Sequence, residues 1–378
     1  MINCSKLLQH EVGELSHLHY TKHKAPVIVW NVIKECNLSC LHCYAESGFG
    51  QQDGTVSNKE AKEFIDDIAS IKVPALLFSG GEPLLRKDIF DLGHYASKKG
   101  IYAALSTNGT LITEDIAGKI KDARFKYVGI SLDGLESTHD NFRASKGSFK
   151  LSIKGLDNCN KLGIKTGVRF TLSKHNYKDL IKLVGYLADK GVKRFCLYHL
   201  VYSEKGRAKF EDDLGSSLKR DTLDSFFSAI EKMLDDGIDM EVLTVDNHAD
   251  GVYLYQKLKA KDSGLARYAE ELILKGSGCS AGVGIASVDP FGEVHPCQFW
   301  GHISLGNIQE KPFSEIWYDN NNEFLNMIRN GREKLKGRCG LCKYKTGCGG
   351  CRLRAEKRFT DLWVEDPACY LTEEEIRK

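Results

Sequence analysis

Three closely spaced cysteines are the residues of this chain best suited to do chemistry. Cys36, Cys40 and Cys43 follow an apolar run with the spacing C-x3-C-x2-C, and Tyr44 comes next. Three thiolates on one short loop can hold three irons of a cubane cluster and leave the fourth iron open to another ligand. A zinc site fits this spacing poorly, because zinc loops usually present their cysteines as one pair and complete the site with a second pair. The other alternative to a cluster is that the three cysteines are ordinary buried thiols of the core. The spacing predicts an iron–sulfur cluster with an open iron.

The composition is that of a soluble globular protein and excludes several classes. The 378 residues carry a net charge of +2, so the chain has no basic footprint for nucleic acid. No apolar run reaches the roughly 20 residues that span a bilayer, and the N-terminus lacks the pattern of a secretory signal. Thirteen cysteines in such a chain indicate reduced metal ligands rather than disulfides. We therefore expect a cytoplasmic protein that binds neither nucleic acid nor membrane.

From residue 26 onward, short apolar runs alternate with amphipathic stretches of helical spacing. Strand–helix units joined by short turns are typical of a parallel sheet that helices cover. The predicted fold class is therefore α/β, a partial (β/α)6 barrel of the TIM type, with a further strand at 240–245. The six expected barrel strands lie at 27–33, 75–78, 101–105, 127–132, 165–172 and 194–200.

The composition changes near Ser277, beyond which cysteine and glycine become frequent. We take this change as a boundary between a barrel and a metal-stapled region. The expected division is an N-terminal segment 1–25, a barrel 26–240, a helical connector 241–276 and a cysteine-rich region 277–378.

Polar stretches follow the expected strands, at the end where a parallel barrel carries its active site. They are 79–83, 106–109 and 131–134, with His199 and Tyr202 after the sixth strand. The cysteine loop follows the first strand. A single polar stretch after a strand could simply form a turn. Several such stretches after successive strands predict one shared active-site opening at the end of the barrel.

The cysteine loop with its following aromatic, Tyr44, resembles the signature of radical S-adenosylmethionine enzymes. Gly80-Gly81-Glu82-Pro83 resembles their methionine-binding segment, in which glycines let backbone carbonyls approach the ligand's amino group and Glu82 adds an acceptor. The resemblance implies a 4Fe–4S cluster with exchangeable S-adenosylmethionine on its open iron. It also implies a 5′-deoxyadenosyl radical that removes a substrate hydrogen, and a low-potential electron donor of the ferredoxin or flavodoxin type.

The same resemblance extends to three strand-end residues. Asn108 and Ser131 would reach the ribose or the methionine carboxylate, and Arg169 would pair with that carboxylate bidentately. For Asn108 the alternative is a turn residue before Gly109. For Arg169 it is a structural ion pair.

The C-terminal cysteines resemble the SPASM extension, which carries auxiliary iron–sulfur clusters. The full pattern uses eight cysteines for two clusters, whereas this region has seven. At least one auxiliary 4Fe–4S cluster is implied, assigned to Cys339, Cys342, Cys348 and Cys369. The other three would hold a second cluster with an open iron or a non-cysteine ligand: Cys279, Cys297 and Cys351. In the competing assignment, one iron–sulfur or zinc site uses Cys339, Cys342, Cys348 and Cys351.

Further stretches are similar to the siroheme-processing branch of this family. This likeness implies an iron tetrapyrrole substrate and removal of the two acetate side chains of 12,18-didecarboxysiroheme to give Fe-coproporphyrin III. Oxidation of propionate side chains, the pre-heme d1 reaction, is the alternative, although Cys351 favours acetate removal. A peptide-modifying enzyme is a further alternative, disfavoured because only 35 residues precede Cys36. The stretches are 199–202 with 206–207, 244–251, 292–296, 305–308 with 313–317, and 348–352 with 365–369.

Three residues are candidates for the chemistry on such a substrate. His199 and His248 would ligate the substrate iron or give a proton, and Tyr202 has the same standing. Ordinary structural roles are the alternative for each. A substrate with several carboxylates should be bound by cationic side chains, and the alternative for each of these is a solvated charge on the surface. The candidate cations are Arg143, Lys146, Arg169, Lys205 and Arg207.

Overall fold

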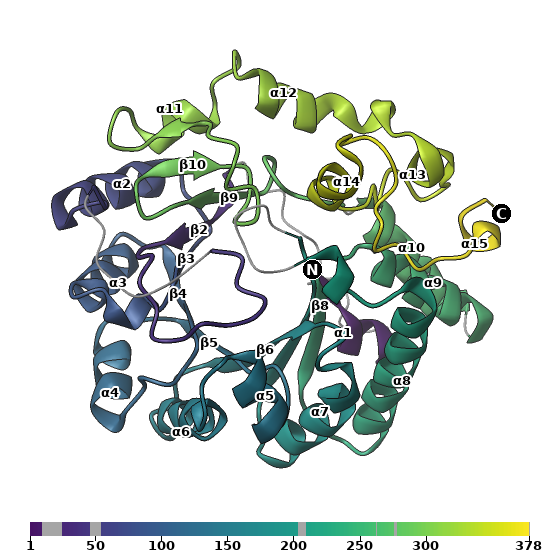
Figure 1. Ribbon diagram of the computed structural model, residues 1–378, viewed down its shortest axis with the longest axis horizontal. Coiled ribbons are helices and arrows are strands. Elements are labelled where there is room, and N and C mark those ends of the chain that lie inside the picture. Colours follow the sequence, from purple (N-terminus) through teal and green to yellow (C-terminus); the bar gives the residue numbers. More distant parts are fainter. Residues whose placement is uncertain (10–24, 46–53, 203–208, 262, 276–277, 378) are drawn as a thin grey trace.

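The computed structural model describes residues 1–9, 25–45, 54–202, 209–261, 263–275 and 278–377. Lys205 and Arg207 lie outside the described residues. Parallel strands in chain order form the centre of the fold (Figure 1). They are β2 (Val27–Asn31), β3 (Ala75–Ser79), β4 (Tyr102–Thr107), β5 (Tyr127–Ser131), β6 (Thr166–Leu172), β7 (Arg194–His199) and β8 (Glu241–Val245).

Helices between these strands cover the outer face of the sheet (Figure 1). The first of them shows why: Ser57 and Glu60 form a capping box, and the apolar residues recur at helical spacing on its buried face. The helices are α2 (Asn58–Ser70), α3 (Ile89–Lys98), α4 (Glu114–Asp122), α5 (Glu136–Phe142), α6 (Ser148–Lys161), α7 (Leu180–Asp189) and α8 (Ser216–Asp235).

The predicted α/β class and the partial parallel barrel are confirmed. The six expected barrel strands correspond to β2–β7, and β8 pairs in parallel with β7 as a seventh. The parallel sheet therefore continues into the segment that we expected to be a connector. That segment then forms α9 (Ala249–Lys261) and α10 (Ser263–Lys275).

The two edges of the barrel sheet are extended by distant parts of the chain. At one edge, β1 (Ile2–Asn3) pairs antiparallel with β8 and leads into α1 (Cys4–Leu8). At the other edge, β9 (Ile285–Val288) pairs in parallel with β2. The N-terminal segment, in which the sequence showed no motif, thus adds a strand.

The C-terminal region begins with this sheet edge and then becomes short elements and turns. It packs against the barrel on the side of β2 and β8 (Figure 1). No helix in the described ranges is long and apolar enough to cross a membrane. The elements after β9 are β10 (Glu293–His295), β11 (Gly306–Asn307), α11 (Phe313–Trp317), α12 (Glu323–Asn330), α13 (Gly337–Leu341), α14 (Arg352–Phe359) and α15 (Glu373–Arg377).

Candidate active site

A cavity opens at the carboxyl ends of the parallel strands, where the sequence predicted a mouth. Residues from the cysteine loop and from the ends of β3–β8 line it together. Of the predicted site residues, the structure places these on its wall: Cys36, Cys40, Cys43, Tyr44, Gly80, Gly81, Asn108, Ser131, Arg143, Arg169 and His199. Glu82, Tyr202 and His248 are not on it.

The three cysteines of the loop all line this cavity. Cys36 and Cys40 are buried, and the backbone N–H of Leu38 donates to the Cys36 sulfur at 3.4 Å. Burial raises the pKa of Cys36 to about 12, so its thiolate would form together with a bound metal. Three sulfurs on one loop, with N–H donors near them, fit a cluster held by three cysteines.

Gly80 and Gly81 are required by the chain that leads into the cysteine loop. Gly80 has φ +139°, and a Cβ there would lie 2.4 Å from the carbonyl oxygen of Ile33. A Cβ on Gly81 would lie 2.1 Å from the carbonyl oxygen of Glu35. The backbone N–H of Gly81 donates to the Ile33 carbonyl at 2.7 Å. The glycines therefore let this loop pair with residues 33–35 while their own backbone faces the cavity.

Glu82 is bonded to donors of the protein itself, and its role as an acceptor for a ligand's amino group stays a prediction. Its side chain is fully buried and does not line the cavity. The carboxylate accepts from the Thr107 hydroxyl at 2.7 Å, and from the backbone N–H groups of Asn108 at 2.9 Å and Leu84 at 3.2 Å. Burial raises its pKa to about 7 against these donors. Glu82 thus joins the ends of β3 and β4.

Asn108 joins the β4 end to the cysteine loop. Its amide N–H donates to the Asn37 side-chain oxygen at 2.9 Å, and its own oxygen accepts from the Thr110 hydroxyl at 2.7 Å. These bonds agree with the alternative role of Asn108, that of a turn residue before Gly109. A contact with ribose or carboxylate stays a prediction, since Asn108 also lines the cavity.

Arg143 serves the cysteine loop rather than standing free for a substrate carboxylate. It is buried, forms an ion pair with the fully buried Asp133, and donates from Nη1 to the Cys40 sulfur at 3.4 Å. His42 completes the group, with Nε2 at 3.8 Å from Asp133 Oδ2 and its ring stacked on Phe142. Burial lowers the pKa of His42 to about 4. Lys146, by contrast, is exposed.

Arg169 points across the sheet into the cavity. Its guanidinium Nη1 donates to the Ser106 hydroxyl. Gly129 on β5 leaves the space for it, because a Cβ there would lie 2.5 Å from Arg169 Nε. Tyr44 closes the same side, with its hydroxyl 3.2 Å from the Asn31 side-chain oxygen. Ser131 also lies on the cavity wall. The contacts of Arg169, Tyr44 and Ser131 with S-adenosylmethionine remain predictions.

The structure separates the three residues that we predicted to act on the substrate. His199 lines the cavity, and its Nε2 lies 2.8 Å from Asp250 Oδ2. Tyr202 instead donates to Asp213 at 2.8 Å, which also accepts from Lys219. This pairing corresponds to its structural alternative.

His248 lies outside the cavity lining. Burial is the largest cause of its low pKa, about 3. We did not single out Asp246, two residues earlier, although it lines the cavity with a buried carboxyl oxygen that has no hydrogen-bond partner among the described residues. Its φ of +68° is rare outside glycine. The signal in the sequence that could have identified Asp246 is its position directly after a predicted strand, where other cavity residues also lie.

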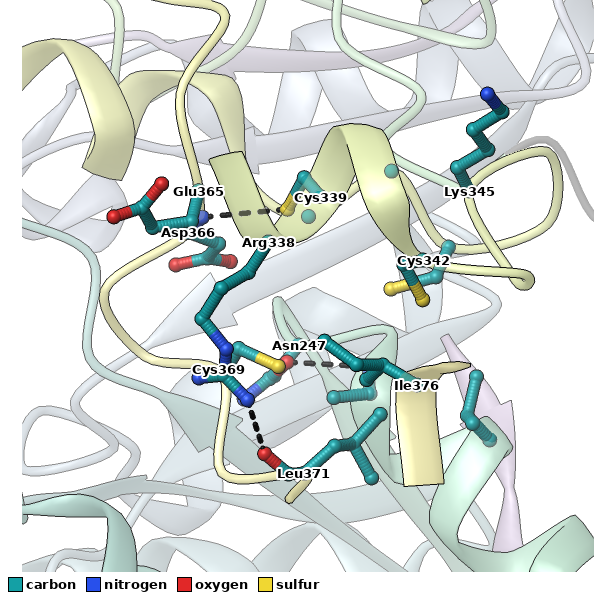
Figure 2. Close-up of a pocket in the computed structure, with 15 residues that line it drawn as sticks. Asn247, Arg338, Cys339, Cys342, Lys345, Glu365, Asp366, Cys369, Leu371 and Ile376 are labelled. Atoms are coloured by element: carbon teal, nitrogen blue, oxygen red, sulfur yellow. Dashed lines mark hydrogen bonds between the residues drawn. The ribbon is translucent and has the colours of Figure 1, made fainter. Parts of the chain in front are cut away.

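The C-terminal cysteines form two groups. A small cavity, about 30 Å³, is lined by Cys339, Cys342, Cys348 and Cys369, three of which are labelled in Figure 2. In the described chain, no three His, Cys, Asp or Glu side chains converge on a point that suits a single ion. The four cysteines instead line one cavity, as the ligands of a cluster would.

The second group lies closer to the barrel cavity. Cys279, Cys297 and Cys351 pack around one small apolar cluster that includes Val201 and Trp300. Val201 also lines the barrel cavity. Cys351 thus lies with this group, which favours the first of our two ligand assignments; both remain proposals about metal binding.

Comparison with known proteins agrees with this arrangement. Residues 30–187 match the radical SAM superfamily, and residues 279–343 match an iron–sulfur cluster-binding domain, SPASM. The chain is 44% identical to Fe-coproporphyrin III synthase of Methanosarcina barkeri over 96% of this chain and 92% of that protein. It is 38% identical to pre-heme d1 synthase of Dinoroseobacter shibae, over 92% and 86%.

Solved structures share the fold at lower identity. A complex titled native anSMEcpe with bound AdoMet has a TM-score of 0.70 and 21% identity, covering 91% of this chain and 94% of that chain. SuiB of Streptococcus suis, bound to precursor peptide SuiA, has a TM-score of 0.73 and 20% identity, covering 92% and 76%. The chain is therefore a radical S-adenosylmethionine enzyme with a SPASM extension, and it belongs to the family of Fe-coproporphyrin III synthase and pre-heme d1 synthase.

Proposed function

We propose that this enzyme removes the two acetate side chains of 12,18-didecarboxysiroheme to give Fe-coproporphyrin III. The observation that carries the proposal is the 44% identity to Fe-coproporphyrin III synthase over nearly the whole of both chains. The likeness to pre-heme d1 synthase is lower over a smaller share, so propionate oxidation is the second candidate. Both reactions require an iron tetrapyrrole at the barrel mouth.

The residues of the cavity wall suit this chemistry. When bound, a cluster on Cys36, Cys40 and Cys43 with S-adenosylmethionine supplies a 5′-deoxyadenosyl radical. Arg169 offers a half-buried cation on the cavity wall for a carboxylate of that ligand. The strand-end wall on the β7 and β8 side remains for the substrate.

The C-terminal groups would hold auxiliary clusters. We assign a complete 4Fe–4S cluster to the cavity lined by Cys339, Cys342, Cys348 and Cys369. The sulfur of Cys339 accepts from the backbone N–H of Asp366 at 3.4 Å and from Arg352 at 3.6 Å, donors that suit a thiolate. A second cluster is assigned to Cys279, Cys297 and Cys351. A cytoplasmic ferredoxin or flavodoxin is the proposed electron donor.

The test is anaerobic incubation of the reconstituted enzyme with reductant, S-adenosylmethionine and 12,18-didecarboxysiroheme, with products identified by mass. Loss of both acetate side chains supports the proposal. Oxidised propionates with the acetates intact would support the second candidate instead. A Cys36/Cys40/Cys43→Ala variant should form no 5′-deoxyadenosine, and iron bound to this variant without zinc supports the auxiliary assignment.

A further inference from the structure

An exposed leucine lies between two of the cysteines that we assign to the complete auxiliary cluster. Leu341 is the last residue of α13 and comes directly before Cys342, with Cys339 two residues ahead of it. Its side chain is 65% exposed, the largest fraction among the exposed large apolar residues of the described ranges. A single exposed leucine is ordinary, so its meaning depends on what surrounds it.

Positive charge surrounds this leucine. Residues 331–345 carry six lysines and arginines and one carboxylate, although the whole chain has a net charge of only +2. Two of the six are neutralised, since Lys336 pairs with Asp361 at 3.1 Å and Arg338 pairs with Glu373 at 2.7 Å. The other four contact carbonyl oxygens or aromatic rings, and within the described ranges none pairs with a carboxylate: Arg332, Lys334, Lys343 and Lys345.

Two of these lysines lie close to both Leu341 and the cluster cysteines. Lys343 and Lys345 are exposed on either side of the buried Tyr344, whose backbone N–H donates to the Cys342 sulfur at 3.4 Å. The Lys345 amine donates at 3.4 Å to the carbonyl oxygen of the residue before Leu341. Lys345 also lines the cavity of the four cysteines, and its side chain extends away from Cys342 in Figure 2. We call Leu341, Lys343 and Lys345 the Leu341 patch.

A patch of this kind beside a cluster suits contact with an electron-carrier protein. Electron transfer slows steeply with distance, so a carrier must dock next to the cluster that it reduces. Such contacts are small, usually below about 1,200 Å² in total, and charges on the two surfaces steer the encounter. The Leu341 patch offers an apolar centre with cations beside it, which complements a carrier that has carboxylates around its redox centre.

The cysteine loop of the barrel has a similar leucine without these charges. Leu41 is 49% exposed and lies between two cysteines of that loop. Residues 36–45 include no lysine or arginine, and the nearby Arg143 is buried and paired with Asp133. The cavity beside the loop is also where we place S-adenosylmethionine and the substrate. Charge complementarity therefore favours the Leu341 patch as the place where an acidic carrier docks.

We propose that the Leu341 patch is the docking surface of an acidic ferredoxin, which reduces the adjacent auxiliary cluster. In this step the reduced ferredoxin loses one electron and becomes oxidised, and the oxidised 4Fe–4S cluster gains that electron. The inference rests on the proposed function, which supplies the auxiliary cluster and the low-potential donor. A small patch fits a small carrier, and a flavodoxin is the other occupant that the test separates.

The experiment measures the binding of an acidic plant-type 2Fe–2S ferredoxin to the reconstituted holoenzyme by calorimetry, at low and at high salt. The variants are Leu341→Ala and Lys343→Ala/Lys345→Ala. The matched control, Lys121→Ala/Lys126→Ala, removes the same charge from two exposed lysines in α4 and before β5. Figure 1 shows α4 on the opposite side of the molecule from α13.

We expect Lys343→Ala/Lys345→Ala to weaken binding roughly tenfold at low salt and less at high salt, because salt screens exposed charges. Leu341→Ala should weaken binding about fivefold at both salt concentrations. The control pair and Leu41→Ala should each change the affinity less than about twofold. Equal losses in both lysine pairs, or a loss in Leu41→Ala with none in Leu341→Ala, overturns the inference.

A second measurement follows the electron itself. Stopped-flow absorption records reduction by ferredoxin in the Cys36/Cys40/Cys43→Ala variant, which would keep the auxiliary clusters alone. Adding Lys343→Ala/Lys345→Ala should slow this reduction roughly tenfold, whereas dithionite, which needs no docking surface, should reduce both forms equally. An unchanged rate with ferredoxin overturns the inference, and so does a holoenzyme that binds flavodoxin but no ferredoxin.

The two measurements also separate this inference from the proposed function. If the Cys36/Cys40/Cys43→Ala variant holds no iron, the auxiliary assignment of the proposed function fails, and electron delivery fails with it. Calorimetry with the holoenzyme still decides in that case whether the Leu341 patch binds ferredoxin. Equal iron content and equal reduction by dithionite show that the lysine variants are folded.

Discussion

At the scale of single residues, burial decides what each charged group can do. Arg143 looked like one of several cations for a substrate carboxylate. In the fold it is 8% exposed, is neutralised by Asp133 and donates to the Cys40 sulfur. Its positive charge therefore lies beside Cys40, a predicted ligand of the cluster that would accept an electron. Hydrogen bonds and charges at cluster sulfurs set reduction potentials.

We therefore predict that removing Arg143 lowers the potential of the cluster on the cysteine loop. Arg143→Gln alone would leave Asp133 as an unpaired buried charge, so the comparison is Asp133→Asn against Asp133→Asn/Arg143→Gln. The double variant should have a potential about 60 mV more negative, a tenfold change in a one-electron equilibrium. The measurement is an EPR-monitored redox titration of the signal that changes when S-adenosylmethionine is added. Equal potentials in the two variants would contradict the prediction.

At the scale of elements, the loop after β3 couples two signatures that lie far apart in the sequence. Gly80 and Gly81 allow it to pair with residues 33–35, which lead directly into the cysteine loop. Asn108 then joins the end of β4 to that same loop. The position of the thiols thus depends on three strand ends at once.

Gly81→Ala should disturb this coupling. The added Cβ would meet the Glu35 carbonyl at 2.1 Å, and backbone atoms cannot move aside cheaply. We expect the affinity for S-adenosylmethionine to fall at least about tenfold and the unfolding free energy to fall by about 1–3 kcal/mol. Equilibrium dialysis and thermal unfolding of the reconstituted enzyme measure these effects.

Gly118→Ala is the matched control, because an added Cβ in the middle of α4 meets nothing within 4 Å. It should leave ligand affinity unchanged and raise stability by roughly 0.5–1 kcal/mol, since alanine has the higher helix propensity. Equal effects of the two substitutions on S-adenosylmethionine affinity would show that the loop contact is unimportant.

At the scale of the whole molecule, one buried ion pair joins the C-terminal region to the barrel mouth. Arg354 pairs with Asp366 at 2.8 Å and donates to the carbonyl oxygens of Leu200 and Asp246 at the ends of β7 and β8. Asp366 also accepts from the Cys351 backbone N–H at 2.7 Å. The pair therefore contacts the barrel rim and the auxiliary cysteines together.

Arg354→Leu should destabilise the enzyme by about 3–5 kcal/mol, because Asp366 would remain as an unpaired buried charge. Auxiliary iron should fall with it, since the Cys351 and Cys339 segments lose their anchor. The measurements are thermal unfolding and iron content under anaerobic conditions. Arg377→Ala is the control: its side chain is 59% exposed in a pair with Glu373, so a change within about 0.5 kcal/mol is expected. Equal losses in both variants would contradict the anchoring role.

The sequence alone determined the fold class, the family and the residues of the cavity wall that carry backbone or thiol chemistry. These follow from local patterns: strand–helix alternation, cysteine spacing and glycines directly after strands. The N-terminal strand was not predicted, because a two-residue strand has no periodicity and exists through its pairing with β8.

The tertiary structure decided the roles of the ionisable residues. Glu82 is buried behind the cavity and joins two strand ends, Arg143 lies against a thiol, and Cys351 lies with Cys279 and Cys297. It also separated His199 from His248. Such roles depend on burial and on partners far away in the chain, such as Asp250 for His199, and no spacing in the sequence encodes them.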